Sequence, residues 1–180
     1  MKFFINFLTF FRLFSGPIIF AMLLLSFHPA IAFILFVMAS LSDYLDGYLA
    51  RKHSLESTLG EVLDPIADKI LTLFLIITLI LYFNSIYIAM VGAVILSREF
   101  WVSALRDLNA RNNYSDATKV TFLAKLKTSS QFLTFGSFLF GILIDNSLIL
   151  FLSNFFLFGS MILSLQTALN YTKATFDIDS

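Results

Sequence analysis

The chain contains no cysteine, only three prolines and seven glycines in 180 residues, and only 13% charged residues. The absence of cysteine excludes a disulfide framework and any site in which thiolates hold a metal ion. Soluble domains carry about 25% charged residues, so this charge content is too low for a soluble surface. The 12 basic and 12 acidic residues cancel, and this balance gives no reason to expect nucleic acid as a partner.

Apolar residues make up 58% of the chain, 23 of them are phenylalanine, and the mean hydropathy is +0.86. The length accommodates about six membrane spans of roughly 20 residues with short connections. We therefore predict an all-α membrane bundle of six transmembrane helices that forms one domain over residues 1–180. The predicted spans are Phe3–Phe27, Ala30–Ala50, Gly60–Phe83, Ile86–Leu108, Val120–Ile144 and Leu148–Tyr171.

Positive charge marks only one set of span ends. These residues are Lys2, Arg51, Lys52, Arg111, Lys119 and Lys173. The opposite turns, at His28, Asn84-Ser85 and Asp145-Asn146, carry no Lys or Arg. Because positively charged loops stay in the cytoplasm, both termini are expected there, in a bacterial-type inner membrane. A cleaved signal peptide ending near Ala32 is the alternative for the first span.

Ionisable residues inside apolar spans are costly and point to a functional site. They are Arg12, Asp43, Asp46, Asp64, Asp68, Lys69, Arg98, Glu99, Arg106, Lys125 and Lys127. Counting each from its span end places all of them in the cytoplasmic half. The count predicts one polar cavity open to the cytoplasm.

The aspartates follow helical spacing. Asp43 and Asp46 share one face of the second span, and Asp64 and Asp68 share one face of the third. Four facing carboxylates without His or Cys suit hard divalent cations such as Mg²⁺, Mn²⁺ or Ca²⁺. Two such ions would neutralise a pyrophosphate, which indicates metal-assisted phosphoryl-type transfer. A divalent-cation transporter is the non-enzymatic alternative, but it needs polar groups on both sides of the membrane, and the outer half has none.

The segment Asp43-Tyr-Leu-Asp46-Gly47-Tyr-Leu-Ala50-Arg51, followed by Gly60, Asp64 and Asp68 at fixed spacing, resembles the signature of the CDP-alcohol phosphotransferase family. The resemblance implies that the four aspartates bind two Mg²⁺ or Mn²⁺ ions and that Asp68 is also the catalytic base. It further implies CDP-diacylglycerol as the donor and a homodimer. The nucleotide site would be lined by Gly47, Ala50, Arg51 and Gly60.

The rest of the chain is similar to family members that use sn-glycerol 3-phosphate as the acceptor. The resemblance implies transfer of a phosphatidyl group to that acceptor with release of CMP. The acceptor phosphate would be bound by Arg98, Arg106, Lys125 and Lys127. Thr9, Arg12 and Gln131 are further candidate site residues without an assigned ligand. Lys125 and Lys127 are about 200° apart around a helix, so we expect only one of them to point at the phosphate.

Several alternatives remain open at this point. Glu99 either orients an arginine or merely offsets charge. Family members that make cardiolipin, phosphatidylserine or phosphatidylinositol phosphate share the signature. Serine has no phosphate and would not require the cationic set, whereas inositol phosphate would require a similar one.

The assignment of Asp68 as the base gives the first test. Asp68→Asn keeps the size of the side chain but removes its proton acceptor, so release of CMP from CDP-diacylglycerol should fall by about 10²–10⁴-fold. Asp107→Asn, at a position predicted to be solvated, should retain activity. Full activity of Asp68→Asn would disprove the assignment.

Overall fold

The computed structural model describes residues 2–25, 27–53, 58–112, 114 and 121–176, without the side chains of 2–6, 43, 44, 46–53, 58, 59, 61 and 62. All regular structure in these residues is helical, which confirms the all-α prediction. The helices are α1 (Lys2–Leu24), α2 (Pro29–His53), α3 (Thr58–Phe83), α4 (Ile86–Arg111), α5 (Phe122–Leu143) and α6 (Ser147–Phe176).

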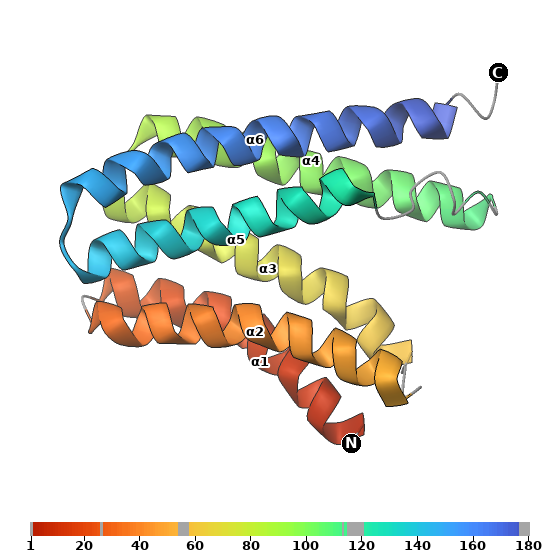
Figure 1. Ribbon diagram of the computed structural model, residues 1–180, viewed down its shortest axis with the longest axis horizontal. Coiled ribbons are helices and arrows are strands. Elements are labelled where there is room, and N and C mark those ends of the chain that lie inside the picture. The colour runs from red at the N-terminus through yellow and green to blue at the C-terminus, as the bar shows by residue number, and fades with distance from the viewer. Residues whose placement is uncertain (1, 26, 54–57, 113, 115–120, 177–180) are drawn as a thin grey trace.

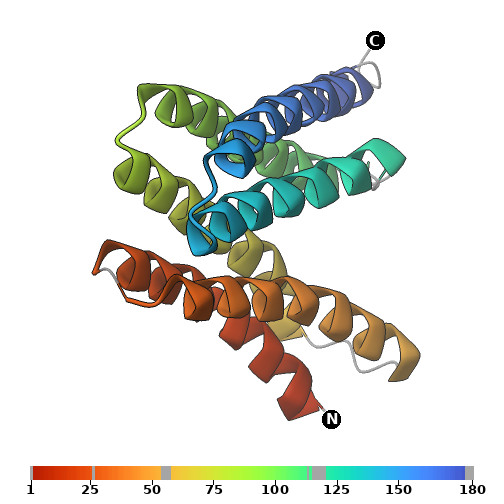
Figure 2. The ribbon, with the colours of Figure 1, turned by 60° about the vertical axis from the view of Figure 1, so that its left-hand side comes forward.

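The helices run back and forth along one common direction (Figure 1). The α1–α2, α3–α4 and α5–α6 turns gather at one end, and the N-terminal end of α1 and the C-terminal end of α6 lie toward the other. α1 packs mainly on α3 and α2, whereas α6 packs on α5 and α4. Figure 2 shows α3 passing between the α1–α2 pair and the group formed by α4, α5 and α6.

Two of the turns have the local chemistry that the sequence predicts. Asn84 and Asp145 adopt positive φ angles of 45° and 51°, a conformation that Asn and Asp tolerate better than most residues. The next residue in each turn caps the following helix. The Ser85 side chain accepts a hydrogen bond from the Ile88 N–H at 3.3 Å, and Asn146 Oδ1 accepts one from the Leu148 N–H at 3.0 Å. These caps satisfy amide groups that a helix start leaves unpaired.

The interior is apolar near the turn end and polar toward the other end. Ile19, Leu75, Phe135 and Phe138 belong to the main buried apolar cluster. Many large apolar side chains point outward instead; Ile86 is 82% exposed and Phe122 is 78% exposed. A soluble protein rarely carries so much exposed apolar surface. Contact with lipid explains it.

Four helices are long and apolar enough to cross a membrane, as the segments Phe7–Leu24, Leu63–Phe83, Ile86–Arg111 and Ser147–Phe176. These helices identify a multi-pass membrane protein. The described apolar part of α2, Pro29–Ser42, is shorter. α5 carries Lys125, Lys127 and Gln131 in its first half, which lowers its apolar content. The prediction of six spans is thus supported for four helices and stays a prediction for α2 and α5.

The close approach of α1 to α3 depends on Gly16. A Cβ atom added there would lie 3.1 Å from Leu71 Cα and 3.3 Å from the Ile70 carbonyl oxygen, both in the backbone of α3. The same atom added at Gly159 of α6 would meet nothing within 4 Å. Small residues allow membrane helices to pack this closely.

Gly16→Ala should therefore push α1 away from α3 and lower the stability by about 1–3 kcal/mol. Gly159→Ala is the matched control and should leave the stability equal or higher, because Ala favours helix more than Gly does. Thermal unfolding in detergent measures both variants. Equal melting temperatures for the two variants would contradict the close α1–α3 contact.

Candidate functional site

A cavity of about 850 Å³ opens between α2, α3, α4 and α5. Its charged lining consists of Asp68, Lys69, Arg98, Glu99, Arg106, Lys125 and Lys127. Its other lining residues include Ser40, Thr72, Ser103, Thr128, Ser129 and Gln131, with Phe132 and Phe135 beyond them. The structure thus brings Asp68 and all four cations predicted to bind the acceptor into one cavity.

The positive and negative charges among the described lining residues do not cancel. Five of the described side chains are cationic and two are acidic, a net charge of three positive (five minus two). Arg106 lies close enough to Arg98 and to Lys127 for the like charges to repel each other. An anion that entered the cavity would relieve this repulsion.

The two aspartates of α3 are held by α1. Arg12 is fully buried, and its Nη1 donates to Asp68 Oδ1 at 2.5 Å. Its Nη2 lies 3.9 Å from Asp64 Oδ1, which also accepts a hydrogen bond from Thr9 Oγ1 at 2.8 Å. The buried guanidinium therefore balances the charge of Asp68 and fixes α1 against α3. Thr9 and Arg12 were predicted only as further candidates, and the structure gives both direct contacts with signature residues.

The signature residues of α2 lie on the last turns of that helix. Asp43, Asp46, Gly47, Ala50 and Arg51 belong to α2, but their side chains lie outside the described residues. Gly60 is buried in the first turn of α3. The predicted nucleotide contacts of these residues remain a prediction.

The two predicted ions stay a prediction, and the described residues bear on it only through the chemistry of their donor atoms. Asp64 and Asp68 offer carboxylate oxygens one helical turn apart, with Thr9 and Arg12 orienting them. Among the described residues no cluster of three or more His, Cys, Asp or Glu side chains forms a metal site. Hard divalent ions fit such an oxygen donor set, and a full set would need the aspartates of α2.

Arg98 connects α4 to α6. It is 6% exposed, its Nε donates to the Ser164 carbonyl oxygen at 2.8 Å, and its Nη2 donates to Thr167 Oγ1 at 2.5 Å. Nη1 donates to Glu99 Oε1 at 3.3 Å. Each guanidinium nitrogen thus has a protein partner, so Arg98 acts mainly as a bridge between helices.

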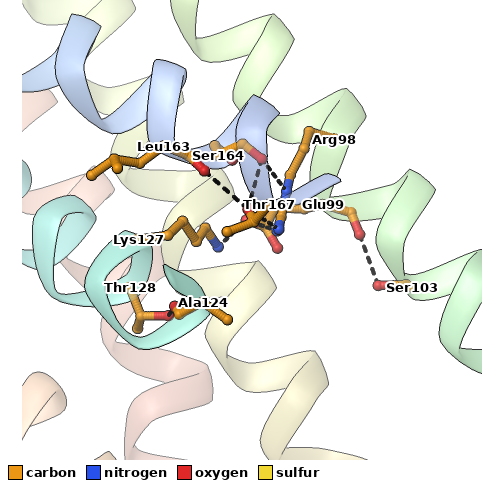
Figure 3. Close-up of polar contacts among 9 residues, drawn as sticks. All are labelled: Arg98, Glu99, Ser103, Ala124, Lys127, Thr128, Leu163, Ser164 and Thr167. Carbon is orange, nitrogen blue, oxygen red and sulfur yellow. Dashed lines mark hydrogen bonds and ion pairs between the residues drawn. The ribbon is translucent and has the colours of Figure 1, made fainter. Parts of the chain in front are cut away.

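Glu99 lies between Arg98 and Lys127. Lys127 of α5 donates to the same Glu99 Oε1 that accepts from Arg98. Figure 3 shows Lys127 reaching from α5 toward Glu99, with Arg98 and Thr167 beside it. Of the two roles considered for Glu99, the structure supports orientation: this carboxylate holds one arginine and one lysine.

Arg106 and Lys125 differ from the buried pair. Both are exposed, and they line the cavity from α4 and α5. The Arg106 Cζ lies 5.7 Å from the centre of the Tyr171 ring of α6, within the range of a cation–π contact. Neither side chain forms a salt bridge with another described residue. Both cations are therefore available to an anionic ligand at the mouth of the cavity.

The polar face of α6 was not predicted from the sequence. This face consists of the buried residues Ser160, Ser164, Thr167, Tyr171 and Thr175. Besides the Arg98 contacts, Thr175 Oγ1 accepts from Asn109 Nδ2 of α4 at 2.9 Å. The signal was present, because these residues follow steps of three and four, the spacing of one helix face.

The sequence is also similar to known proteins over most of its length. The model of the CDP-alcohol phosphatidyltransferase family matches residues 4–169. The protein is therefore a member of the CDP-alcohol phosphatidyltransferase family, in agreement with the resemblance of its signature.

Individual members of the family are similar to this chain over most of their length. A protein of Wigglesworthia glossinidia brevipalpis is 36% identical over 161 residues, covering 86% of this chain and 88% of the relative. One of Haemophilus influenzae is 33% identical over 74% of this chain and 73% of the relative. One of Salmonella choleraesuis is 30% identical over 69% of each. All three are named CDP-diacylglycerol–glycerol-3-phosphate 3-phosphatidyltransferase.

The bridging role of Arg98 gives a test that does not require activity. In Arg98→Lys, a single nitrogen replaces the three guanidinium nitrogens that bond separately to Ser164, Glu99 and Thr167, so we expect at least one of these hydrogen bonds to be lost. A hydrogen bond from a charged group contributes about 1.5–3 kcal/mol. We expect a loss of this size in the free energy of unfolding, measured by thermal or denaturant unfolding in detergent.

Arg111→Lys is the control, because Arg111 pairs with Asp107 at 2.7 Å on the exposed surface of the same helix. Such pairs contribute about 0–1 kcal/mol. If Arg98→Lys were as stable as Arg111→Lys, the contact of Arg98 with α6 would not support the fold.

Proposed function

We propose that this protein transfers the phosphatidyl group of CDP-diacylglycerol to sn-glycerol 3-phosphate, giving phosphatidylglycerophosphate and CMP. The observation that carries the proposal is a cavity that contains Asp68 and whose described charged side chains are mostly cationic. The names of the relatives support the same reaction. Glycerol 3-phosphate combines a phosphate dianion with a free hydroxyl group, and the cavity offers cations for the first and a carboxylate for the second.

Arg106 and Lys125 are the residues best placed to bind the acceptor phosphate. They are exposed in the cavity, whereas Arg98 and Lys127 are engaged by Glu99 and α6. An arginine can donate two parallel hydrogen bonds to a phosphate, and a lysine adds a point charge. Arg98 and Lys127 then contribute positive charge from behind.

Asp68 removes the proton from the acceptor. As the hydroxyl oxygen forms its bond to the β-phosphorus of the donor, the proton passes to the Asp68 carboxylate. The bond from that phosphorus to the bridging oxygen breaks, and CMP leaves with the electron pair. Arg12, in contact with Asp68 at 2.5 Å, keeps the carboxylate oriented.

We further propose that Asp43, Asp46, Asp64 and Asp68 bind two Mg²⁺ or Mn²⁺ ions. When bound, such ions supply charge compensation for a pyrophosphate. Gly47, Ala50, Arg51 and Gly60 line the nucleotide site in this proposal, and the small residues leave room for the cytidine and its phosphates.

The finer membrane arrangement belongs to the same proposal. All six helices span the inner membrane, both termini lie in the cytoplasm, and the cavity opens to that side. The support is that Arg111 and Lys173 lie at the end away from the three turns, and positive charge favours the cytoplasm. A homodimer and a single domain over residues 1–180 remain predictions.

An assay with purified protein tests the proposed reaction. Labelled glycerol 3-phosphate, serine, inositol phosphate and phosphatidylglycerol are compared as acceptors for CDP-diacylglycerol, with and without Mg²⁺. We expect Mg²⁺-dependent turnover of glycerol 3-phosphate. Turnover of serine alone would overturn the acceptor while leaving the family chemistry intact.

The same assay tests the phosphate site. Arg106→Ala should raise the KM for glycerol 3-phosphate by about tenfold or more, because it removes a charged hydrogen-bond donor. Arg111→Ala, on the same helix but not among the cavity-lining residues, should behave like the unchanged protein. Unchanged kinetics of Arg106→Ala would show that the phosphate binds elsewhere.

A further inference from the structure

Gln131 is the innermost polar residue that α5 contributes to the cavity. It is 6% exposed, and only Phe132 and Phe135 follow it among the lining residues of α5. Its Nε2 has no hydrogen-bond partner in the described part of the chain. A buried amide N–H without an acceptor is costly, so this group calls for a polar ligand in the cavity.

Glu99 is the neighbouring group that could accept a hydrogen bond from this amide. Its Oε1 already accepts from Lys127 and from Arg98, which leaves Oε2 for Gln131. An amide nitrogen carries two N–H groups, and Glu99 can accept at most one of them through that oxygen. At least one N–H of this buried neutral donor therefore still lacks an acceptor among the described residues, in a side chain that lines the cavity.

The depth of Gln131 matches that of Asp68. Gln131 is nine residues into α5 and Asp68 is ten residues into α3, and both helices begin at the same end of the bundle. At 1.5 Å per residue, both lie about 14–15 Å from their helix starts. Lys125 is only three residues into α5, and Arg106 is five residues from the end of α4. Lys125 and Arg106 therefore lie at the mouth of the cavity, and Gln131 lies at the depth of Asp68.

This arrangement, with cations at the mouth and Gln131 deeper in the cavity, suits the shape of the acceptor. The rise from Lys125 to Gln131 is about 9 Å, which a three-carbon phosphate bridges once the lysine side chain extends. With its phosphate at the mouth and its reacting hydroxyl at Asp68, glycerol 3-phosphate places its second hydroxyl beside the reacting carbon. That hydroxyl is uncharged, and a neutral amide donor is sufficient to bind it.

We propose that Gln131 is a specificity-determining residue that donates through Nε2 to the second, non-reacting hydroxyl group of the acceptor. The assignment rests on the proposed function. It gives the site a means to distinguish glycerol 3-phosphate from a phosphate of the same length without that hydroxyl. A site built to hydrogen-bond a substrate hydroxyl disfavours the analogue that lacks it.

The test compares glycerol 3-phosphate with 3-hydroxypropyl phosphate, which lacks only the middle hydroxyl. The unchanged protein should prefer glycerol 3-phosphate by about 3- to 10-fold in kcat/KM, the range of one neutral hydrogen bond. Gln131→Met keeps the length of the side chain and removes the donor, so the ratio should fall to near one. Most of that change should come from a lower kcat/KM for glycerol 3-phosphate.

Thr134→Val is the matched control. Thr134 lies three residues deeper on the same buried face of α5, and its hydroxyl bonds only within its own helix, to the Ser130 carbonyl oxygen at 2.8 Å. This variant should keep the preference for glycerol 3-phosphate. If Gln131→Met fails to fold, Gln131→Asn withdraws the donor by one methylene and should reduce the preference.

The outcomes separate the two proposals. A ratio retained in Gln131→Met, or an equal loss with both acceptors, would overturn the specificity role while the proposed reaction stands. An unchanged protein without preference between the two acceptors would overturn it as well. An unchanged protein that turns over neither phosphate would overturn the proposed function and the role of Gln131 with it.

Discussion

A charged side chain inside an apolar helix bundle is stable only beside an opposite charge or a set of hydrogen-bond partners. Two junctions meet this requirement. Arg12 pairs with Asp68 and so joins α1 to α3. Glu99 pairs with Lys127 of α5 and with Arg98, which in turn bonds to α6. These contacts connect the helices across the polar half of the bundle, where apolar packing is least extensive.

The same requirement divides the cations by role. A guanidinium whose nitrogens all bond to protein groups is fixed in place, and Arg98 meets that description. Arg106 and Lys125 have no such set of partners among the described residues, and both line the cavity. The fixed cations provide a constant positive field, while the exposed ones can follow a ligand. This division explains how a bundle with so few charged residues can hold a strongly charged substrate near a carboxylate.

Local features of the fold could be predicted from the sequence. The spacing of Asp64 and Asp68 fixes them on one helix face, since the helix repeat is local. Asn84 and Asp145 stand in turns because their side chains suit the backbone there. Each of these features depends on neighbours in the chain. The one-sided distribution of buried charge also predicted a polar cavity, because the span order brings those charges to one end of the bundle.

The roles of individual cations could not be predicted in this way. Arg98 and Arg106 carry the same signal in the sequence, and only the packing of α4 on α6 distinguishes them. Lys125 and Lys127 point about 200° apart at the backbone, yet both line the cavity because long side chains can reach around a helix. The α6 polar face was visible as a spacing, but its partner helix depends on tertiary packing.

The proposed function requires a cavity that opens at the basic end of the bundle and binds the acceptor there. The chain has no cysteine, so a maleimide can react only with the one thiol that is introduced. Ser103 lines the cavity, and Ser147 lies exposed at the opposite end. The measurement is labelling of Ser103→Cys and Ser147→Cys with a membrane-impermeant maleimide in vesicles of known orientation.

We predict that Ser103→Cys reacts only when the cytoplasmic face is outward, and more slowly once glycerol 3-phosphate is added. Ser147→Cys should react only from the other face, at a rate that the acceptor does not change. Labelling of Ser103→Cys from the face that labels Ser147→Cys, or labelling that glycerol 3-phosphate leaves unchanged, would contradict the account.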